Sequence, residues 1–355
     1  MFDIKSLVRS NILAMKPYSS ARDEFVGEAS IYIDANENNL GSLAENQSFN
    51  RYPDPYQRKL KAKIALIKGV QPNQIFLGNG SDEAIDLLIR LVCKPGHDEI
   101  LTFGPTYGMY DVAANLNDVF LRHISLDENF QVQISKLQGQ IHANTKIIFL
   151  CSPNNPTGNL INPKSIEYIL KNFAGLVVVD EAYIDFAKAE SWTKRLAEFP
   201  NLVVLQTFSK AWGMAALRLG MAFASPEIIS FLNKIKPPYN ISEATQLIAL
   251  DALKRADRLP DMIAEINQGR EYLTQALAEL PVVQKIYPSD ANFLLIQVTD
   301  ANKIYDYLLS KGIVVRNRTN QPNCFNCLRI SVGTSTENEA LVAALKTYAE
   351  ADLVK

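Results

Sequence analysis

The stretch NLVVLQTFSKAWGMAALRLGMAFA, residues 201–224, shows the pattern on which the chain is built. Its apolar run Leu202–Leu205 predicts a buried strand, and Ser209 and Lys210 follow where that strand ends. A lysine in a cleft at such a point has a lowered pKa, because burial disfavours its charged form. In that state a lysine amine attacks a carbonyl group. A surface lysine that begins a helix is the commoner explanation of a lone Ser-Lys pair, so its neighbours must decide.

The composition is that of an ordinary globular protein. With 355 residues the chain is longer than a typical single hydrophobic core supports, so we expect two domains. Hydrophobic residues make up 47% and charged residues 21% of the chain, as in most soluble proteins. A net charge of -2 argues against a large nucleic-acid-binding surface. Small-molecule chemistry is therefore the better expectation.

The N-terminal segment does not predict a targeting or membrane segment. Asp3, Lys5 and Arg9 interrupt its apolar residues, so the hydrophobic core of a signal peptide is missing. No apolar run in the chain approaches the length of a transmembrane helix. We therefore expect a cytoplasmic protein without a membrane partner.

The cysteines and histidines do not follow a metal-site pattern. Cys324 and Cys327 form a CxxC, but no second CxxC or nearby histidine completes a zinc site. A redox pair would open a helix after a strand, whereas residues 322–326 have the composition of a loop. The histidines are scattered, at His97, His123 and His142. We expect reduced thiols and no metal.

Strand-like and helix-like segments alternate between residues 74 and 224. Helical segments such as Asp82–Val92 separate most of the apolar runs. This alternation predicts an α/β fold with a mostly parallel seven-stranded sheet between helices. The predicted strands are Ile75–Leu77, Glu99–Phe103, Val119–Ile124, Lys146–Cys151, Leu176–Asp180, Leu202–Thr207 and Leu219–Ala224.

The chain changes character after Pro237-Pro238, which predicts a second, smaller α+β domain. We assign residues 29–240 to a large domain, and residues 1–28 and 241–355 to the small one, as an N-terminal arm and a C-terminal unit. Elements expected outside the large sheet are a strand at Ile31–Ile33, helices at Gln57–Lys68, Ser242–Leu280 (interrupted at Pro260), Asn302–Ser310 and from Asn338 onward, and strands at Phe293–Val298, Gly312–Arg316 and Cys327–Val332.

Polar residues follow most of the predicted strands, and ligands of open parallel sheets bind at the carboxyl ends of the strands. After the first strand comes GNGSDE, in which Ser81 and Asp82 begin a helix. Glycines and the free N–H groups of a helix N-terminus suit a phosphate. A tight turn with a Ser or Asp cap explains this segment equally well on its own.

The other strand ends add an aromatic ring, an amide, a carboxylate, a phenol and an amine. These come from Tyr107, Asn155, Asp180, Tyr183 and Lys210. Pyridoxal 5′-phosphate uses this whole set: a lysine, an acid for its ring nitrogen, donors for its phenolate oxygen and an anion site. A nicotinamide dehydrogenase would need G-x-G-x-x-G after the first strand, and the sequence has none there.

Several segments resemble those of known enzymes. SPNNPTG (152–158), DEAY (180–183), TFSKAWGMAALRLG (207–220) and LRISVG (328–333) are similar to the signature segments of fold-type I pyridoxal-phosphate aminotransferases. PYSSAR (17–22), RYPDPY (51–56), GNGSDEAIDLLIR (78–90) and GPTYGMY (104–110) resemble the histidinol-phosphate aminotransferase family. The resemblance runs from about residue 17 to residue 333.

The resemblance implies a role for each matched residue. Lys210 would carry the cofactor, Asp180 would pair with the ring nitrogen, and Tyr107 would stack on the ring. Asn155 and Tyr183 would hold the phenolate oxygen. The remaining positions implied for the cofactor phosphate are Ser81, Asp82, Ser209, Arg218 and, from the partner subunit of a homodimer with shared sites, Tyr52.

The resemblance also implies the reaction. L-Histidinol phosphate and 2-oxoglutarate would give imidazole acetol phosphate and glutamate, a step of histidine biosynthesis. The substrate residues would be Arg329, Arg316, Tyr18 and Asn36. Alternatives are an aminotransferase for aromatic amino acids, a threonine-phosphate decarboxylase, and a non-catalytic regulator of the same fold. The chain departs from the family at Asn39, where a proline is usual, and in its CxxC.

Overall fold

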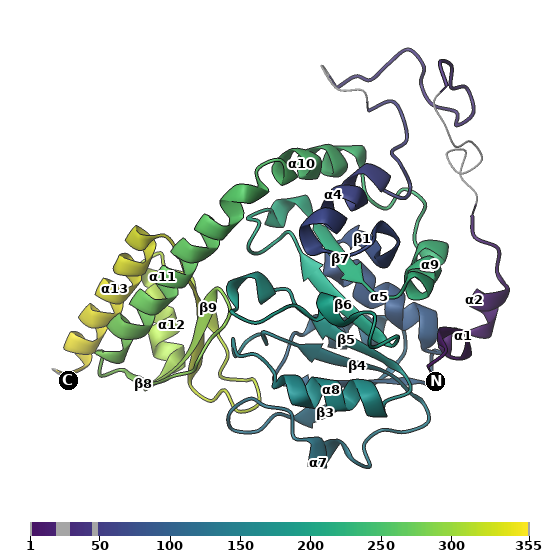
Figure 1. Ribbon diagram of the computed structural model, residues 1–355. Helices are drawn as coiled ribbons and strands as arrows, with labels where there is room; N and C mark the ends of the chain where they lie inside the picture. Colours follow the sequence, from purple (N-terminus) through teal and green to yellow (C-terminus); the bar gives the residue numbers. More distant parts are fainter. Residues whose placement is uncertain (1, 19–28, 45–48, 354–355) are drawn as a thin grey trace.

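A seven-stranded sheet forms the centre of the larger part of the protein (Figure 1). The computed structural model describes residues 2–18, 29–44 and 49–353. The strand order is β1-β7-β6-β5-β4-β2-β3; β7 is antiparallel to both neighbours and all other neighbouring pairs are parallel, which confirms the predicted fold class. The strands are β1 (Ile75–Asn79), β2 (Glu99–Gly104), β3 (Phe120–Ser125), β4 (Thr145–Cys151), β5 (Leu176–Asp180), β6 (Leu202–Thr207) and β7 (Leu219–Phe223).

Helices cover both faces of this sheet, so its strands are apolar on both sides. In β5, Val177 and Val179 belong to one hydrophobic cluster, while Leu176 and Val178 belong to the other. Strand side chains alternate between faces, so a doubly covered strand shows an unbroken apolar run. The helices of this part are α4 (Arg58–Lys68), α5 (Ser81–Val92), α6 (Met109–Leu116), α7 (Ile134–Leu137), α8 (Pro163–Asn172), α9 (Pro226–Ile235) and α10 (Glu243–Leu253).

The N-terminal helices α1 (Ile4–Leu7) and α2 (Ser10–Ala14) pack on the large sheet's helices. Ile4, Val8 and Ile12 are buried in the same cluster as residues of α5 and α9. The spacing i, i+4, i+8 puts these apolar side chains on one side of the segment, where α5 and α9 cover them. Residues 4–14 thus lie with the large unit, unlike the assignment of the whole arm to the small domain. Helix α10 also packs with the large unit, in one cluster with α4, although residues 241–355 were assigned to the small domain. The other domain limits stay a prediction.

The predicted strand at Ile31–Ile33 is wrong. The segment has no strand pairing in the structure, and Ile31 and Ile33 are 75% and 81% exposed. A short β-branched run becomes a strand only where a neighbouring strand edge is available for its backbone.

A four-stranded antiparallel sheet with three helices forms the smaller part, with strand order β10-β11-β9-β8. Its elements are α11 (Leu259–Ala278), β8 (Val283–Ile286), β9 (Phe293–Val298), α12 (Ala301–Ser310), β10 (Arg316–Asn317), β11 (Cys327–Ser331) and α13 (Ser335–Leu353). Three details differ from the sequence predictions, and the first is β8, which was not predicted. The expected strand Gly312–Arg316 is reduced to β10, and Pro260 lies in the first turn of α11, so the helix breaks before it.

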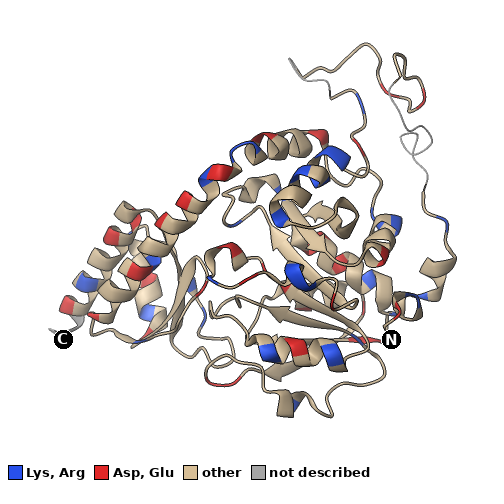
Figure 2. Cartoon of the chain, viewed as in Figure 1, with Lys and Arg blue, Asp and Glu red and all other residues tan. Residues whose placement is uncertain are grey.

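Lysine and arginine residues are interspersed with aspartate and glutamate along the ribbon of both parts in this view (Figure 2). Within the described chain, no helix is both long and apolar enough to cross a membrane. Neighbouring parallel strands end together at one edge of the large sheet: Cys151 of β4 is level with Asp180 of β5, which is level with Leu205 of β6. The residues that follow these strands therefore meet.

Candidate active site

Two adjoining cavities lie at this edge, and Lys210 lines both. The larger has a volume of about 690 Å³ and the smaller about 90 Å³. Tyr107, Asn155 and Tyr183 also line both cavities. The Lys210 Nζ atom lies 5.3 Å from the centre of the Tyr183 ring. Burial and, next, the positive charge of Arg329 lower the pKa of Lys210, so its reactive neutral form is favoured.

Asp180 lies buried at the end of β5 with two hydrogen-bond donors. Its Oδ2 accepts from the Tyr110 hydroxyl at 2.8 Å, and its Oδ1 accepts from the Ala182 N–H at 3.1 Å. Burial raises the pKa of Asp180 to about 6, although both donors act in the opposite direction. Asp180 also lines the smaller cavity. A positive group bound there would favour the carboxylate form.

Tyr110 is a site residue that the sequence analysis missed. Tyr110 lies in the first turn of α6 and is fully buried. Its ring stacks on that of Phe149, with the ring centres 4.7 Å apart. Its hydroxyl is the donor to Asp180. A second tyrosine three residues after Tyr107 was the available signal, because positions that close can serve the same edge of a sheet.

An anion cradle forms where β1 passes into α5. Gly80 adopts φ +74, and the first-turn N–H groups of α5 have no partner within the helix. Gly220 of β7 approaches so closely that a Cβ atom would lie 2.1 Å from the Ser81 nitrogen. Ser81, Asp82, Ser209 and Arg218 line the smaller cavity together. The structure thus brings four of the five residues predicted for the phosphate to one place, and Tyr52 lies elsewhere.

Arg218 has one backbone hydrogen bond and two longer side-chain contacts, and it keeps donors for a ligand. Its Nη1 donates to the Ala215 carbonyl at 3.2 Å and lies 3.4 Å from Ser209 Oγ, and its Nη2 lies 3.5 Å from Asp82 Oδ2. The Asp82 carboxylate also accepts from the Tyr107 hydroxyl at 3.1 Å. The Arg218 side chain is 52% exposed. A phosphate in the cradle would replace long contacts with charge-assisted ones.

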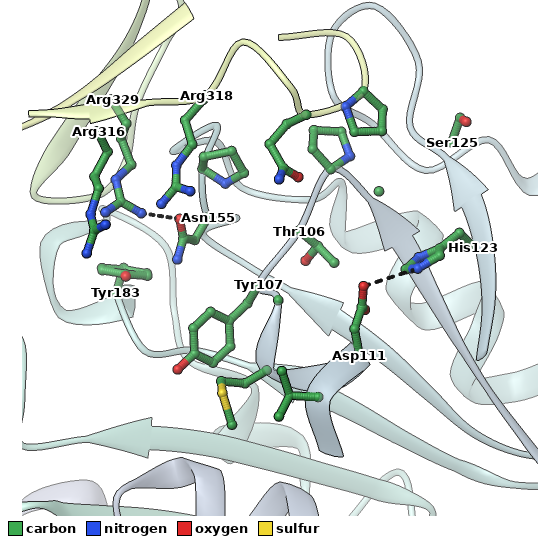
Figure 3. A pocket seen from close by; sticks show the side chains of 18 of the residues that line it. Thr106, Tyr107, Asp111, His123, Ser125, Asn155, Tyr183, Arg316, Arg318 and Arg329 are labelled. Carbon is green, nitrogen blue, oxygen red and sulfur yellow. Dashed lines mark hydrogen bonds and ion pairs between the residues drawn. The ribbon is translucent and has the colours of Figure 1, made fainter. Parts of the chain in front are cut away.

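Arg329 reaches from the small sheet to the edge of the large one. Its Nη1 donates to Asn155 Oδ1, a contact that joins β11 to the loop after β4 (Figure 3). This bond leaves the Asn155 amide nitrogen as a donor for the cavity. The Arg329 guanidinium also lies over the Phe293 ring, at 5.3 Å. Arg316 lines the larger cavity beside it.

Three predicted site residues do not reach Lys210 within one chain. Tyr52 and Asn36 line a separate cavity of about 480 Å³, where Tyr52 stacks on Tyr239 at 4.5 Å. Glu37 fixes this turn, because its carboxylate accepts from the Tyr52 N–H at 2.7 Å. Tyr18 is 72% exposed and lines neither Lys210 cavity.

Arg318 lines the larger cavity and was also missed. It stands two residues after Arg316, and residues i and i+2 of a strand share a face. The Arg-Asn-Arg spacing at a predicted strand end was therefore the signal.

The four cysteines are buried and unbonded. Cys327 begins β11, and Cys324 precedes it in a turn closed by a Cys327 N–H to Cys324 carbonyl bond of 3.0 Å. No group of three or more potential metal-ligating residues occurs in the described parts of the chain.

Known proteins resemble this chain over nearly its whole length. The family model "Aminotransferase class I and II" matches residues 26–345. A histidinol-phosphate aminotransferase of Parabacteroides distasonis is 55% identical over 346 residues, covering 98% of this chain and 99% of the relative.

Two solved structures are similar to the protein. The histidinol-phosphate aminotransferase from Clostridium acetobutylicum has a TM-score of 0.79 at 25% identity, with 85% of this chain and 92% of that chain covered. The enzyme of the same name from Sinorhizobium meliloti, in complex with pyridoxal-5′-phosphate, has a TM-score of 0.78 at 24% identity, with 89% and 90% covered. At 24% identity, the similarity to the Sinorhizobium meliloti structure supports the fold alone.

Proposed function

Since the chain belongs to the aminotransferases of class I and II, with histidinol-phosphate aminotransferases among its relatives, we propose that it transaminates L-histidinol phosphate. The acceptor is 2-oxoglutarate, and the products are imidazole acetol phosphate and glutamate, in histidine biosynthesis. The observation that carries this proposal is one cavity that holds both the Lys210 amine and the arginines of the small sheet. A substrate that carries an amine and, apart from it, an anionic group would place the amine at Lys210 and the anionic group at the arginines.

The residues present fit pyridoxal 5′-phosphate, the cofactor of this enzyme class. The cofactor supplies an aldehyde that takes up the amino group and a ring that accepts electrons. The cradle of Ser81, Asp82, Ser209 and Arg218 would hold its phosphate. Asp180 would hold the proton on its ring nitrogen, and the donors from Tyr110 and Ala182 orient that carboxylate.

The other cofactor residues act from the sides of the ring. Asn155 and Tyr183 would donate to the phenolate oxygen, and Tyr107 would stack on the ring. Lys210 would attach the aldehyde before substrate arrives. Once released, the Lys210 amine would take the proton from the substrate Cα and pass it to the cofactor carbon that carried the aldehyde, and its lowered pKa makes the neutral amine available for this.

The substrate's anionic end would lie against Arg329 and Arg316. Both line the larger cavity with Lys210, and a guanidinium can bind phosphate or carboxylate through two parallel hydrogen bonds. One site can thus serve histidinol phosphate and glutamate in turn. Tyr18 and Asn36 would complete the substrate site in the assembled dimer.

A panel of amino donors tests the function. We expect the purified protein, loaded with pyridoxal phosphate, to prefer L-histidinol phosphate by kcat/KM over phenylalanine and tyrosine. A wide preference for aromatic amino acids would favour an aromatic aminotransferase instead. Carbon dioxide released from threonine phosphate would favour a decarboxylase, and no turnover with any donor would favour a regulator.

A homodimer with shared sites is part of the proposal, and a cytoplasmic location follows from the biosynthetic role. Tyr52 and Asn36 lie away from Lys210 in their own chain, and nearby Leu40 and Leu43 are 98% and 105% exposed. A second copy that covers this segment would bring Tyr52 to its neighbour's phosphate cradle.

Mixing two inactive variants tests the shared site. In a mixed dimer of Lys210→Ala and Tyr52→Ala chains, one site keeps both Lys210 and Tyr52, so activity should return. Tyr52→Phe, which keeps the ring stack on Tyr239, separates loss of the hydroxyl from misfolding. Full activity in a monomeric fraction would contradict the shared site.

A further inference from the structure

Arg318 belongs to a group of three guanidinium groups in the Lys210 cavity. Arg316 of β10 lies directly opposite Arg329 of β11. The Arg318 N–H donates to the Cys327 carbonyl at 2.8 Å, which extends this pairing beyond β10. Arg318 therefore shares a face with Arg316, and Figure 3 shows the three side chains pointing into the cavity above Asn155 and Tyr183.

These three charges lack acidic partners within the described chain. The one acidic residue that lines the cavity is Asp111, and its carboxylate lies 3.4 Å from His123. The Nε atoms of Arg318 and Arg329 are buried without a hydrogen-bond partner among the described residues. Burial and, next, the charge of Arg316 lower the pKa of Arg318. Like charges on opposing strands destabilise a sheet, so the arrangement calls for a bound anion.

The size of that anionic charge distinguishes the two substrates. A carboxylate carries one negative charge on two oxygens, and one or two arginines can satisfy it. A phosphate monoester carries about -1.5 to -2 charges at pH 7 and offers three acceptor oxygens. Arg329 already gives one of its donors to Asn155, so the added charge and donors of a third guanidinium suit a doubly charged phosphate and exceed what a single carboxylate needs.

We propose that Arg318 is a specificity-determining residue, which binds the phosphate of the phosphorylated amino donor and contributes little to binding the carboxylates of glutamate. The inference rests on the proposed function, because that function supplies a phosphate ester and a dicarboxylate to one cavity. Arg316 and Arg329 serve both substrates, whereas Arg318 serves the dianion.

The test compares two half-reactions of one variant. Arg318→Gln keeps a polar side chain of moderate length and removes the charge. The pyridoxal-phosphate-loaded protein is mixed with L-histidinol phosphate or with L-glutamate, and the change in cofactor absorbance gives kcat/KM for each donor. Arg255→Gln is the matched control, because Arg255 is an exposed residue of the segment before α11 that pairs with Asp251.

We expect Arg318→Gln to lower kcat/KM for histidinol phosphate by roughly 10- to 100-fold, the usual effect of losing a charged hydrogen-bond donor. The value for glutamate should fall less than about threefold, because its carboxylate binds through Arg316 and Arg329. Arg318→Lys should restore part of the loss, because it returns the charge without the fork.

Two outcomes would overturn the role of Arg318: an equal loss for both donors, or no loss for either. They differ from failure of the proposed function itself. In that case the wild-type protein would accept glutamate but not histidinol phosphate, before any substitution is made.

Discussion

The two sheets contribute to one cavity in opposite ways. The large sheet presents Asp180 at the end of a buried strand, where Tyr110 and Ala182 already donate to it. The small sheet presents Arg316 and Arg318 at a two-residue strand, with no acidic partner in the described chain. The first arrangement is satisfied before a ligand binds, whereas the second is completed by the ligand. We therefore expect cofactor chemistry and substrate recognition to fail separately under substitution.

Lys210→Ala should have the largest effect, because it removes the amine on which both sheets converge. Loss of a general acid-base group costs about 10²- to 10⁴-fold in rate. Single-turnover measurements with either donor should show this loss, while Lys188→Ala, an exposed lysine, should behave like the wild type. Borohydride reduction should fix a pyridoxyl group on the peptide that contains Lys210. Label on another lysine would refute the assignment.

Asp180→Asn tests the large sheet alone. The amide is nearly isosteric with the carboxylate but neutral, so it cannot hold a protonated ring nitrogen. Breaking a buried charge pair costs about 3–5 kcal/mol, or at least about 10²-fold in rate. The cofactor spectrum should shift and both half-reactions should slow equally. Near-normal turnover with an unshifted spectrum would show that Asp180 does not serve the ring nitrogen.

Arg329→Ala tests the small sheet. Both half-reactions should lose roughly 10- to 100-fold in kcat/KM, because the residue meets phosphate and carboxylate alike. The cofactor spectrum without substrate should stay that of the wild type. Arg258→Ala, another exposed arginine before α11, is the control. If the variant lost its cofactor instead, the small sheet would also serve cofactor binding, and the division of roles between the two sheets would be wrong.

The smallest effect concerns stability against pH in the cofactor-free protein. The pKa of Asp180 is raised to about 6, above its value in the unfolded chain. The folded state therefore binds more protons than the unfolded state between about pH 4 and pH 6, and stability falls as pH rises through that window. Urea unfolding at several pH values should show that the free energy of unfolding of the wild type, relative to that of Asp180→Asn, falls by about 2–3 kcal/mol over this pH range. A difference that does not change with pH would mean that Asp180 is charged throughout.

The strands of the large sheet were predictable because most are covered on both faces, which requires an unbroken run of apolar residues. Leu176–Asp180 is buried on both faces, and its apolar run ends in the polar residue that serves the site. Lys210, Asn155 and Tyr183 could be found by the same reasoning, since all follow strands that end at one edge. Their convergence needed only the topology of a parallel sheet.

The small sheet was harder to predict because its pattern is weak. β8 has four residues that are exposed or half-buried, so no hydrophobic period marks it. β10 has two residues and depends on pairing with β11. The Arg-Asn-Arg spacing places Arg318 on the same face as Arg316, but only the register of β10 on β11 shows that this face meets Arg329. Tyr52 and Asn36 were recognisable by resemblance, but within their own chain they line a cavity that Lys210 does not share.

The hydrogen bond between Arg329 and Asn155 links the substrate-binding arginines to the cofactor-binding residues, so binding at one can affect binding at the other. An anion that draws Arg329 away frees the Asn155 oxygen and changes the orientation of its amide. Coupling between two binding sites is reciprocal. If bound cofactor changes the affinity for the anion by some factor, bound anion changes the affinity for the cofactor by the same factor. Inorganic phosphate should thus alter the dissociation constant of pyridoxal phosphate through Arg329, and Asn155→Ala should remove that part of the coupling. Equal coupling in wild type and variant would show that this bond transmits nothing.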